Sequence, residues 1–378
     1  MLPPLEAGRF FFPPEWHPHI ATILGFPSQA ATCGELYLQN CREIVDLAAA
    51  IAEFEPVRLY ARPEDVPGVQ QLVHRTVDDP SRVTVIPTSI NHCWVRDTGP
   101  VYVHDASGEL DPKQRLAISF EFNEWGNKNG WEGIDGDYRY ANPSMSPEAL
   151  QENTDFARNV IESDTAPSPV QVVKSRIRTE GGGLVVDGEG TLIVAESYMV
   201  CDQRNPGMSR DEIEAELRRL LGVEKVIWVP GRKGLDITDC HVDAEVRFIR
   251  PGVLVWSRHH PSVPQVWLDM SQEIRNILAD ETDAKGRKFE LHAIDEPGPE
   301  DLGIQEHDEF VSGYANFYFC NGGVIVPGFG VEEYDRKARE TLQALMPERK
   351  VRQVQLNAIP LSGGVIHCVT QQIPMPAA

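Results

Sequence analysis

One cysteine near the end of the chain follows a pair of glycines. Cys368 lies in the segment LSGGVIHCVTQQIP, residues 361–374. A cysteine attacks as its thiolate, which needs a base or a cation nearby. The seven cysteines of the chain are scattered and form no CxxC pair, so the sequence indicates neither a zinc knuckle nor a disulfide framework. We take Cys368 as the candidate nucleophile.

Acids and a histidine occur upstream, where predicted strands meet turns. His241 and Asp243 are two residues apart in CHVD and would point to one face of an extended segment. Asp97 lies in WVRDTGP, and Glu180 stands before three glycines, where the backbone can approach a ligand closely. Each acid could equally cap backbone amides, and no second histidine pair completes a metal site.

Taken together, these residue types favour one reaction. Three carboxylates in one pocket disfavour a thiolate and an oxyanion, which argues against protease-like acyl transfer. A substrate with its own positive charge removes that conflict. A planar guanidinium matches carboxylates through forked hydrogen bonds. We therefore expect a thiolate to attack a guanidinium carbon.

Alternating short strands and helices must position these residues. Apolar runs predict strands at 20–26, 56–60, 82–87, 116–123, 224–231, 253–256 and 350–355, with hairpins around 187–190 and 321–323. Apolar periodicity predicts helices at 36–54, 64–76, 147–163, 265–280 and 334–345. A further helix is marked by a capping box of Ser209 and Glu212 and ends at Gly222. Residues 296–313 are acidic and predict a surface loop.

The overall composition limits the partners of the chain. The 378 residues carry a formal net charge of −22, which disfavours nucleic acid and anionic membranes and favours cationic partners. The first residues lack a basic start and a long apolar run, and no segment approaches the roughly 20 apolar residues that span a bilayer. We expect a cytoplasmic α/β protein in which residues 1–378 form one catalytic domain.

The motifs together resemble the agmatine deiminases. These belong to the guanidino-group-modifying superfamily, which also contains arginine deiminases and peptidylarginine deiminases. The resemblance runs in the family's order from about residue 16 to residue 374. It is carried by WVRDTGP, EFNEWG, TEGGGLVVDGEGTL, NPGMSRDEIEAELRRLLGVEKVIWVP, CHVD, ETDAKGRKF, YANFYFCNGGVIVPGFG and GGVIHCVTQQIP.

The resemblance implies a fold and an activity. The fold would be a five-bladed α/β propeller, with pseudo-fivefold ββαβ repeats around a central active site. The activity would be hydrolysis of agmatine to N-carbamoylputrescine and ammonia, a step of putrescine and polyamine biosynthesis. Neither a metal nor an organic cofactor would be needed. Family members commonly form dimers or larger homo-oligomers, and we extend that expectation to this chain by analogy.

The resemblance also implies a role for each candidate residue. Cys368 would attack the guanidinium carbon and form an amidino-thioether. His241 would protonate the departing ammonia and then activate water. Asp97 and Asp243 would bind guanidinium nitrogens, while Glu180 would hold His241 and help to bind the substrate.

Three departures from the family pattern concern the far end of the substrate. The family's acid four residues before the histidine is replaced by Ile237, with Asp236 one residue earlier. The family's GGGNIHC reads SGGVIHC, with Val365 in place of asparagine, and NAWGG reads NEWGN, which introduces Glu124. We expect Glu124 or Asp236 to supply the missing charge. The further predicted substrate-binding residues are Trp94, Trp125, Asp236 and Glu124.

Other readings of the same residues are open. A deiminase could act on arginine, on peptidyl arginine or on another guanidino metabolite. Free arginine would need a cationic anchor for its carboxylate, such as Arg96, Arg139 or Arg178. An amidinotransferase would pass the amidino group to an amine. In a different class, the chain could be an inactive guanidine- or polyamine-binding protein, although the intact candidate residues argue against this.

Overall fold

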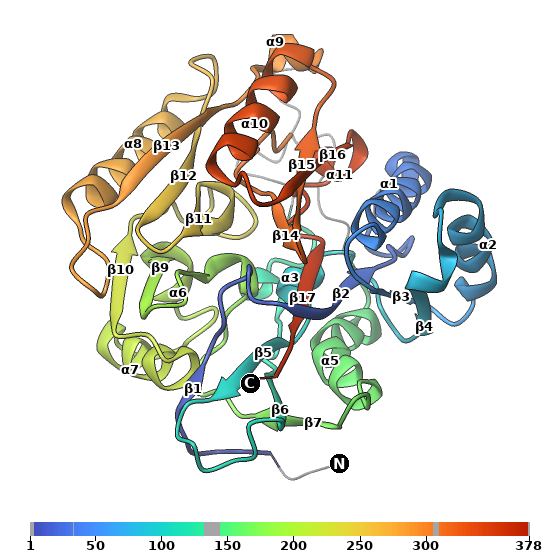
Figure 1. The fold of residues 1–378 in the computed structure, drawn as a ribbon, viewed down its shortest axis with the longest axis horizontal. Helices are drawn as coiled ribbons and strands as arrows, with labels where there is room; N and C mark the ends of the chain where they lie inside the picture. Colours follow the sequence, from blue (N-terminus) through green and yellow to red (C-terminus); the bar gives the residue numbers. More distant parts are fainter. Residues whose placement is uncertain (1–3, 33, 132–143, 305–309, 377–378) are drawn as a thin grey trace.

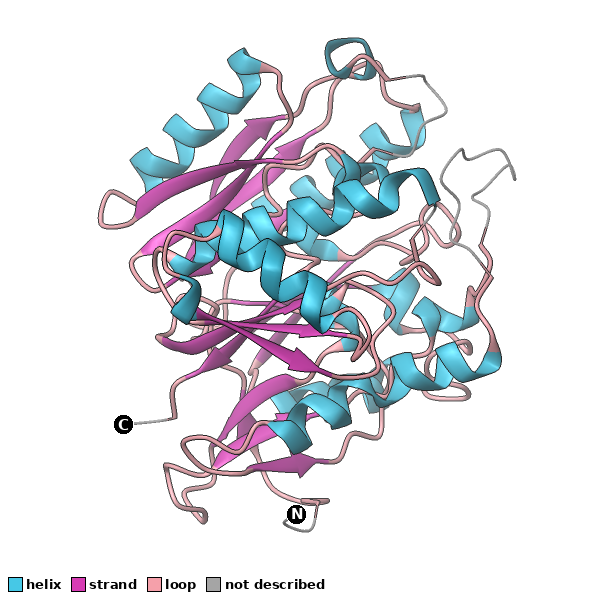
Figure 2. Cartoon of the chain, turned by 90° about the vertical axis from the view of Figure 1, so that its right-hand side faces the viewer, coloured by secondary structure: helices cyan, strands magenta, loops and turns pink. Residues whose placement is uncertain are grey.

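Five small sheets surround the middle of the molecule, and most helices lie at its periphery (Figure 1). The computed structural model describes residues 4–32, 34–131, 144–304 and 310–376. In a perpendicular view the sheets remain separate, with helices packed against them (Figure 2). This arrangement is a five-bladed α/β propeller, as the family resemblance implies.

The two largest sheets have four strands each. One contains β17 (Thr370–Pro374), β2 (His19–Gly25), β3 (Val57–Ala61) and β4 (Val83–Pro87). The other contains β1 (Phe10–Phe11), β5 (Val101–Asp105), β6 (Arg115–Ile118) and β7 (Val170–Val173). The last strand of the chain, β17, pairs antiparallel with β2, so the C-terminal segment closes the ring on the N-terminal one.

The other three sheets have three strands each. The first is formed by β8 (Val185–Val186), β9 (Thr191–Ala195) and β10 (Lys225–Val229). The second is formed by β11 (Val246–Arg250), β12 (Val253–Arg258) and β13 (Glu290–Asp295). The third is formed by β14 (Tyr318–Cys320), β15 (Gly323–Gly328) and β16 (Lys350–Gln355).

Every blade repeats one pattern. An antiparallel pair comes first, and a helix then leads to a parallel third strand, which gives the ββαβ unit. The main helices are α1 (Gly34–Ala52), α2 (Val66–Thr76), α5 (Pro147–Ser163), α7 (Arg210–Leu221), α8 (Gln265–Asp280) and α10 (Glu332–Leu345). Shorter turns are α3 (Val95–Thr98), α4 (Glu124–Asn127), α6 (Glu196–Met199), α9 (Pro299–Leu302), α11 (Ala358–Leu361), η1 (Pro80–Arg82), η2 (Gly181–Gly183) and η3 (Val242–Ala244).

The local sequence signals explain where α7 begins and ends. The side chain of Ser209 accepts from the backbone N–H of Glu212, and the side chain of Glu212 accepts from the backbone N–H of Ser209. The predicted capping box is therefore confirmed. Gly222 ends the helix at a φ of +68°, a conformation that glycine adopts at little cost. Leu217 and Leu220 are fully buried on its inner face.

Two sequence expectations need correction. Asp97 lies in the helical turn α3, just before β5. His241 and Asp243 do not lie on an extended strand, because the chain forms the 3₁₀ turn η3 there. The segment from residue 296 is not wholly a surface loop, since Glu296 is buried. None of the helices in the described ranges has the length and apolar character that crossing a bilayer requires.

Candidate active site

A cavity of about 310 Å³ brings most of the predicted residues together. Its size falls at the lower end of the range for small-molecule sites. Glu180 does not line this cavity but lies next to His241, which does. The predicted residues on the wall are Trp94, Asp97, Trp125, Asp236, His241, Asp243 and Cys368.

The blades deliver their polar residues from equivalent places. In each blade, a turn leads into the first strand of the antiparallel pair, and a site residue lies in or next to that turn. These residues are Asp97 before β5, Glu180 before β8, His241 and Asp243 before β11, Asn316 before β14 and Cys368 before β17. Asn316 was not predicted, although this repeat gives the signal that would have found it.

Glycines keep the space between these residues open. A Cβ on Gly182 would lie 2.6 Å from Nδ1 of His241 and 3.0 Å from Oδ1 of Asp97. A Cβ on Gly364 would lie 2.5 Å from the ring of Trp94. Side chains at these two positions would therefore collide with the site.

His241 is placed to donate a proton. Its Nε2 lies 3.3 Å from Oε2 of Glu180, and its Nδ1 lies 3.5 Å from Oδ2 of Asp97. Burial of the ring opposes a positive charge, but Asp97 and Glu180 outweigh it and raise the pKa of His241 to about 9. The imidazole is therefore protonated at neutral pH.

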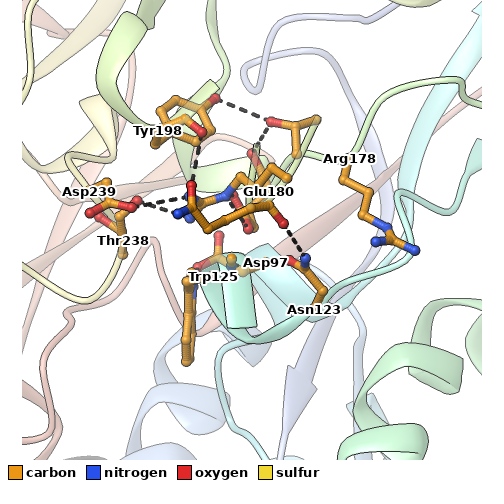
Figure 3. Close-up of polar contacts among 12 residues, drawn as sticks. Asp97, Asn123, Trp125, Arg178, Glu180, Tyr198, Thr238 and Asp239 are labelled. Atoms are coloured by element: carbon orange, nitrogen blue, oxygen red, sulfur yellow. Dashed lines mark hydrogen bonds and ion pairs between the residues drawn. The ribbon is translucent and has the colours of Figure 1, made fainter. Parts of the chain in front are cut away.

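Glu180 is itself held by a buried arginine that was not predicted. Nε of Arg204 donates to both oxygens of Glu180, at 2.9 and 3.0 Å, and Nη1 lies 3.4 Å from Asp239. Figure 3 shows Glu180 among Tyr198, Asp239 and Asp97. Burial would raise the pKa of Glu180, but Arg204 and His241 hold it below its usual value. Glu180 is thus an ionised group that positions His241.

Asp97 is oriented by two donors. Its Oδ2 accepts from Nε1 of Trp125 at 2.9 Å, and its Oδ1 accepts from the backbone N–H of Gly182 at 3.1 Å. Trp125 has a φ of +49°, which is rare for such a large residue and marks a strained loop at the site. Burial, with the charge of Glu180, raises the pKa of Asp97. A cationic ligand beside Asp97 would lower this pKa again.

Asp243 offers a free acceptor inside the cavity wall. Its Oδ2 lies 2.5 Å from Nδ1 of His367. Its Oδ1 is buried and has no hydrogen-bond partner among the described residues. A buried carboxylate oxygen without a donor costs free energy, so a donor from a ligand is expected there.

A buried charge network behind Asp243 was also not predicted. Nε2 of His367 lies 2.7 Å from Oε2 of Glu15. Glu15 also accepts from Arg96 at 3.2 Å and from Arg247 at 3.0 Å. His367 directly precedes Cys368, so this network fixes the loop of Cys368 against Asp243.

The surroundings of Cys368 favour its thiol form. Its Sγ lies 3.4 Å from Oδ1 of Asn316, which also accepts from its backbone N–H at 3.3 Å. Burial raises the pKa of Cys368 well above its usual value, and the charges of Asp243 and Asp97 raise it further. A cation bound between these two carboxylates would reverse their effect.

Comparisons with known proteins identify the family of the chain. The model of the Porphyromonas-type peptidyl-arginine deiminase family matches residues 11–374. The chain belongs to this family. It is 34% identical to an agmatine deiminase of Stutzerimonas stutzeri, over 97% of this chain and 96% of that protein, and 33% identical to one of Medicago truncatula, over 97% and 96%. The solved agmatine deiminase of Enterococcus faecalis is 26% identical, with a TM-score of 0.81 over 99% of this chain and all of that one.

Membership of the deiminase family confirms the resemblance, but two predicted substrate-binding residues lie differently from expectation. Glu124 is buried away from the cavity wall, because its oxygens bind His92 at 2.9 Å and Asn153 at 2.7 Å. Asp236 is on the wall, but its oxygens accept from the backbone N–H groups of Thr238 and Cys240 and so cap their loop. Both carboxylates thus accept hydrogen bonds from the protein, and of the two only Asp236 lies on the cavity wall.

The two other departures from the family pattern lie in different places. Ile237 lines the cavity, whereas Val365 is fully buried in the core.

The predicted anchors for a substrate carboxylate do not line the cavity where they are described. Arg96 is buried with Glu15, and Arg178 lies 3.7 Å from Glu121. Arg139 lies outside the described residues.

Proposed function

We propose that the protein hydrolyses agmatine to N-carbamoylputrescine and ammonia, as a step of putrescine and polyamine biosynthesis. The observation that carries this proposal is Oδ1 of Asp243, which has no hydrogen-bond partner among the described residues and lies on the wall that also presents Asp97 and Cys368. Two carboxylates beside a thiol suit a guanidinium, which donates planar pairs of hydrogen bonds. The names of the relatives supply the substrate.

Substrate binding activates the nucleophile in this proposal. The guanidinium donates to Asp97 and Asp243 and neutralises the charges that raise the pKa of Cys368. The thiol then releases its proton to water, and the thiolate attacks the guanidinium carbon. The tetrahedral adduct carries no net charge at that carbon, so the site needs carboxylates and not an oxyanion hole.

His241 then serves both halves of the reaction. The imidazolium gives its proton to one nitrogen of the adduct, ammonia leaves, and the carbon stays bonded to sulfur as an amidino-thioether. The neutral imidazole next takes a proton from water, whose oxygen attacks the same carbon. The C–S bond breaks, the hydroxyl proton of the adduct passes to the leaving sulfur, and the ureido product forms with the thiol restored.

The cavity wall favours agmatine over arginine. Among the described residues on that wall there is no arginine or lysine to pair with the carboxylate of an amino acid. The walls instead carry Asp97, Asp236 and Asp243, which would repel that carboxylate. An amine at the far end of the substrate avoids this repulsion.

Turnover assays test the proposal. We expect the protein to convert agmatine to equal amounts of ureido product and ammonia, and to act on free arginine at least about a hundredfold less efficiently, since charge mismatch costs several kcal/mol. Binding of agmatine without turnover would contradict the enzyme assignment. Transfer of the amidino group to an added amine would indicate an amidinotransferase.

The pH dependence should follow His241. Because the carboxylates raise its pKa to about 9, the proton donor is present below that pH and is lost as the pH rises through it. We expect kcat/KM to fall above about pH 9. Glu180→Gln removes one of the raising charges and should move this descending limb down by about one unit. A limb that stays in place or moves up would remove His241 from the proton-transfer role.

We also propose that residues 1–378 act as one catalytic unit in the cytoplasm. Six cysteines are unpaired in the described residues, which suits a reducing compartment. Cell fractionation followed by the agmatine assay would test the location.

A further inference from the structure

A second charged cluster lies on the same cavity wall, outside the catalytic group. His259 stands between two glutamates: its Nδ1 lies 2.6 Å from Oε2 of Glu296, and its Nε2 lies 3.1 Å from Oε1 of Glu245. All three line the cavity that contains Cys368. Both glutamates are more than nine-tenths buried, with 5% and 6% of their surface exposed. The proposed chemistry uses none of them.

The blade that contains β11, β12 and β13 builds this cluster at one edge of its sheet. His259 directly follows β12, and Glu296 directly follows β13. These two strands are parallel, so their carboxyl ends meet at the same edge, where Arg258 pairs with Asp295. Glu245 directly precedes β11, and its carbonyl accepts from the backbone N–H of Ser257 at 2.8 Å. The three side chains are thus fixed by strand pairing.

The cluster has more negative than positive charge. Burial disfavours the imidazolium, but Glu296 and Glu245 raise the pKa of His259 to about 12, so the ring stays protonated. Two carboxylates and one imidazolium leave one negative charge. Oε2 of Glu245 is buried and has no hydrogen-bond partner in the described part of the chain.

The neighbouring backbone adds acceptors and leaves space. A Cβ on Gly313 would lie 3.3 Å from Oε1 of Glu296 and 3.4 Å from the carbonyl oxygen of Ala244. Gly313 therefore places no side chain beside these two oxygen atoms. Both oxygens can accept from a donor that carries several N–H groups.

We propose that Glu245 and Glu296 form a distal subsite that binds the second positive charge of the substrate. This inference rests on the proposed function. It defines the substrate class as a guanidinium and a primary ammonium joined by a short alkyl chain. It also explains how this protein, with Ile237 in place of the family's acid, still selects a substrate with two positive charges. A carboxylate at this end would be repelled.

The shared cavity and its wall chemistry support the assignment. Asp243, which offers an oxygen to the guanidinium, and Glu245 line the same cavity. The wall nearby carries the apolar side chains of Val263, Trp267 and Val311, which suit methylene groups.

Two substrates that differ only in the distal charge test the subsite. Agmatine has the terminal ammonium, and n-pentylguanidine has a methyl group there. For the wild-type protein, we expect kcat/KM to be at least about tenfold higher for agmatine. Glu245→Gln should lower kcat/KM for agmatine by about 10- to 100-fold, mainly through KM, and leave that for n-pentylguanidine within about twofold. Glu296→Gln should act in the same direction.

Glu290→Gln is the matched control, because Glu290 is an exposed glutamate on β13 of the same blade. It should leave both substrates unaffected. Equal losses for both substrates in Glu245→Gln, or no loss for either, would overturn the subsite while agmatine turnover by the wild type upholds the proposed function. If Glu245→Gln does not fold, the wild-type comparison decides, and equal efficiency with both substrates overturns the subsite. Turnover of neither substrate by the wild type would overturn the proposed function and this inference with it.

Discussion

Cys368→Ala is expected to abolish agmatine turnover, lowering kcat by about 10⁵-fold or more. The thiol lies beside Asn316, and the charges of Asp97 and Asp243 act on it. The other two cysteines of the described cavity wall, Cys93 and Cys240, belong to buried apolar clusters. Removing a half-buried sulfur leaves the packing almost unchanged, so the variant should unfold like the wild type. An assay of ureido product formation measures the loss of activity, and thermal unfolding measures the stability of the variant.

Cys240→Ala is the control for Cys368→Ala. Cys240 also lines the cavity, but its side chain belongs to a buried apolar cluster, and burial together with Glu245 raises its pKa well above the usual value. It should retain most of the activity. Full activity in Cys368→Ala, or a loss in Cys240→Ala as large as that in Cys368→Ala, would move the nucleophile elsewhere.

Glu15→Gln is expected to lower the free energy of unfolding by about 3–5 kcal/mol, because it leaves two buried arginines without their counter-charge. Burial would raise the pKa of Glu15, but Arg247, His367 and Arg96 keep it well below the usual value. The carboxylate therefore stabilises the fold at neutral pH, and this contribution is lost as the pH falls through its depressed pKa. Equilibrium unfolding in urea at neutral pH measures the change.

Glu6→Gln provides the comparison for Glu15→Gln. Glu6 also pairs with a cation, Lys174, but 73% and 55% of the two side chains are exposed. Solvent screens surface pairs of this kind, which contribute little to stability, so this variant should unfold almost like the wild type. A loss of less than about 1 kcal/mol in Glu15→Gln would show that the buried network does not stabilise the fold as argued.

Signals local in the sequence predicted most of the elements. The capping box at Ser209, the periodicity of residues 265–280 and the hairpin turn at 321–323 each depend on near neighbours, and the structure confirms all three. The candidates Asp97, His241, Asp243 and Cys368 also meet at one cavity. Their motifs carry a strong family pattern, so no long-range reasoning was needed to group them.

Residues that support the site through distant contacts were not predictable in this way. Glu15 and His367 are 352 positions apart, and only closure of the propeller brings them together. Arg204 lies in a loop whose sequence gives no hint that it reaches Glu180. Glu296 lies in an acidic stretch that is typical of a surface loop, and burial beside His259 becomes visible only when β12 and β13 are paired.

The account depends most directly on a covalent bond between Cys368 and the substrate carbon. Acid-quenching the protein during turnover of agmatine and measuring its intact and peptide masses tests this bond. We predict a transient species heavier by agmatine minus ammonia, on the peptide that contains Cys368 and absent from Cys368→Ala. Product formation with no such species in the wild type at any quench time, or with the added mass on another residue, would contradict the account.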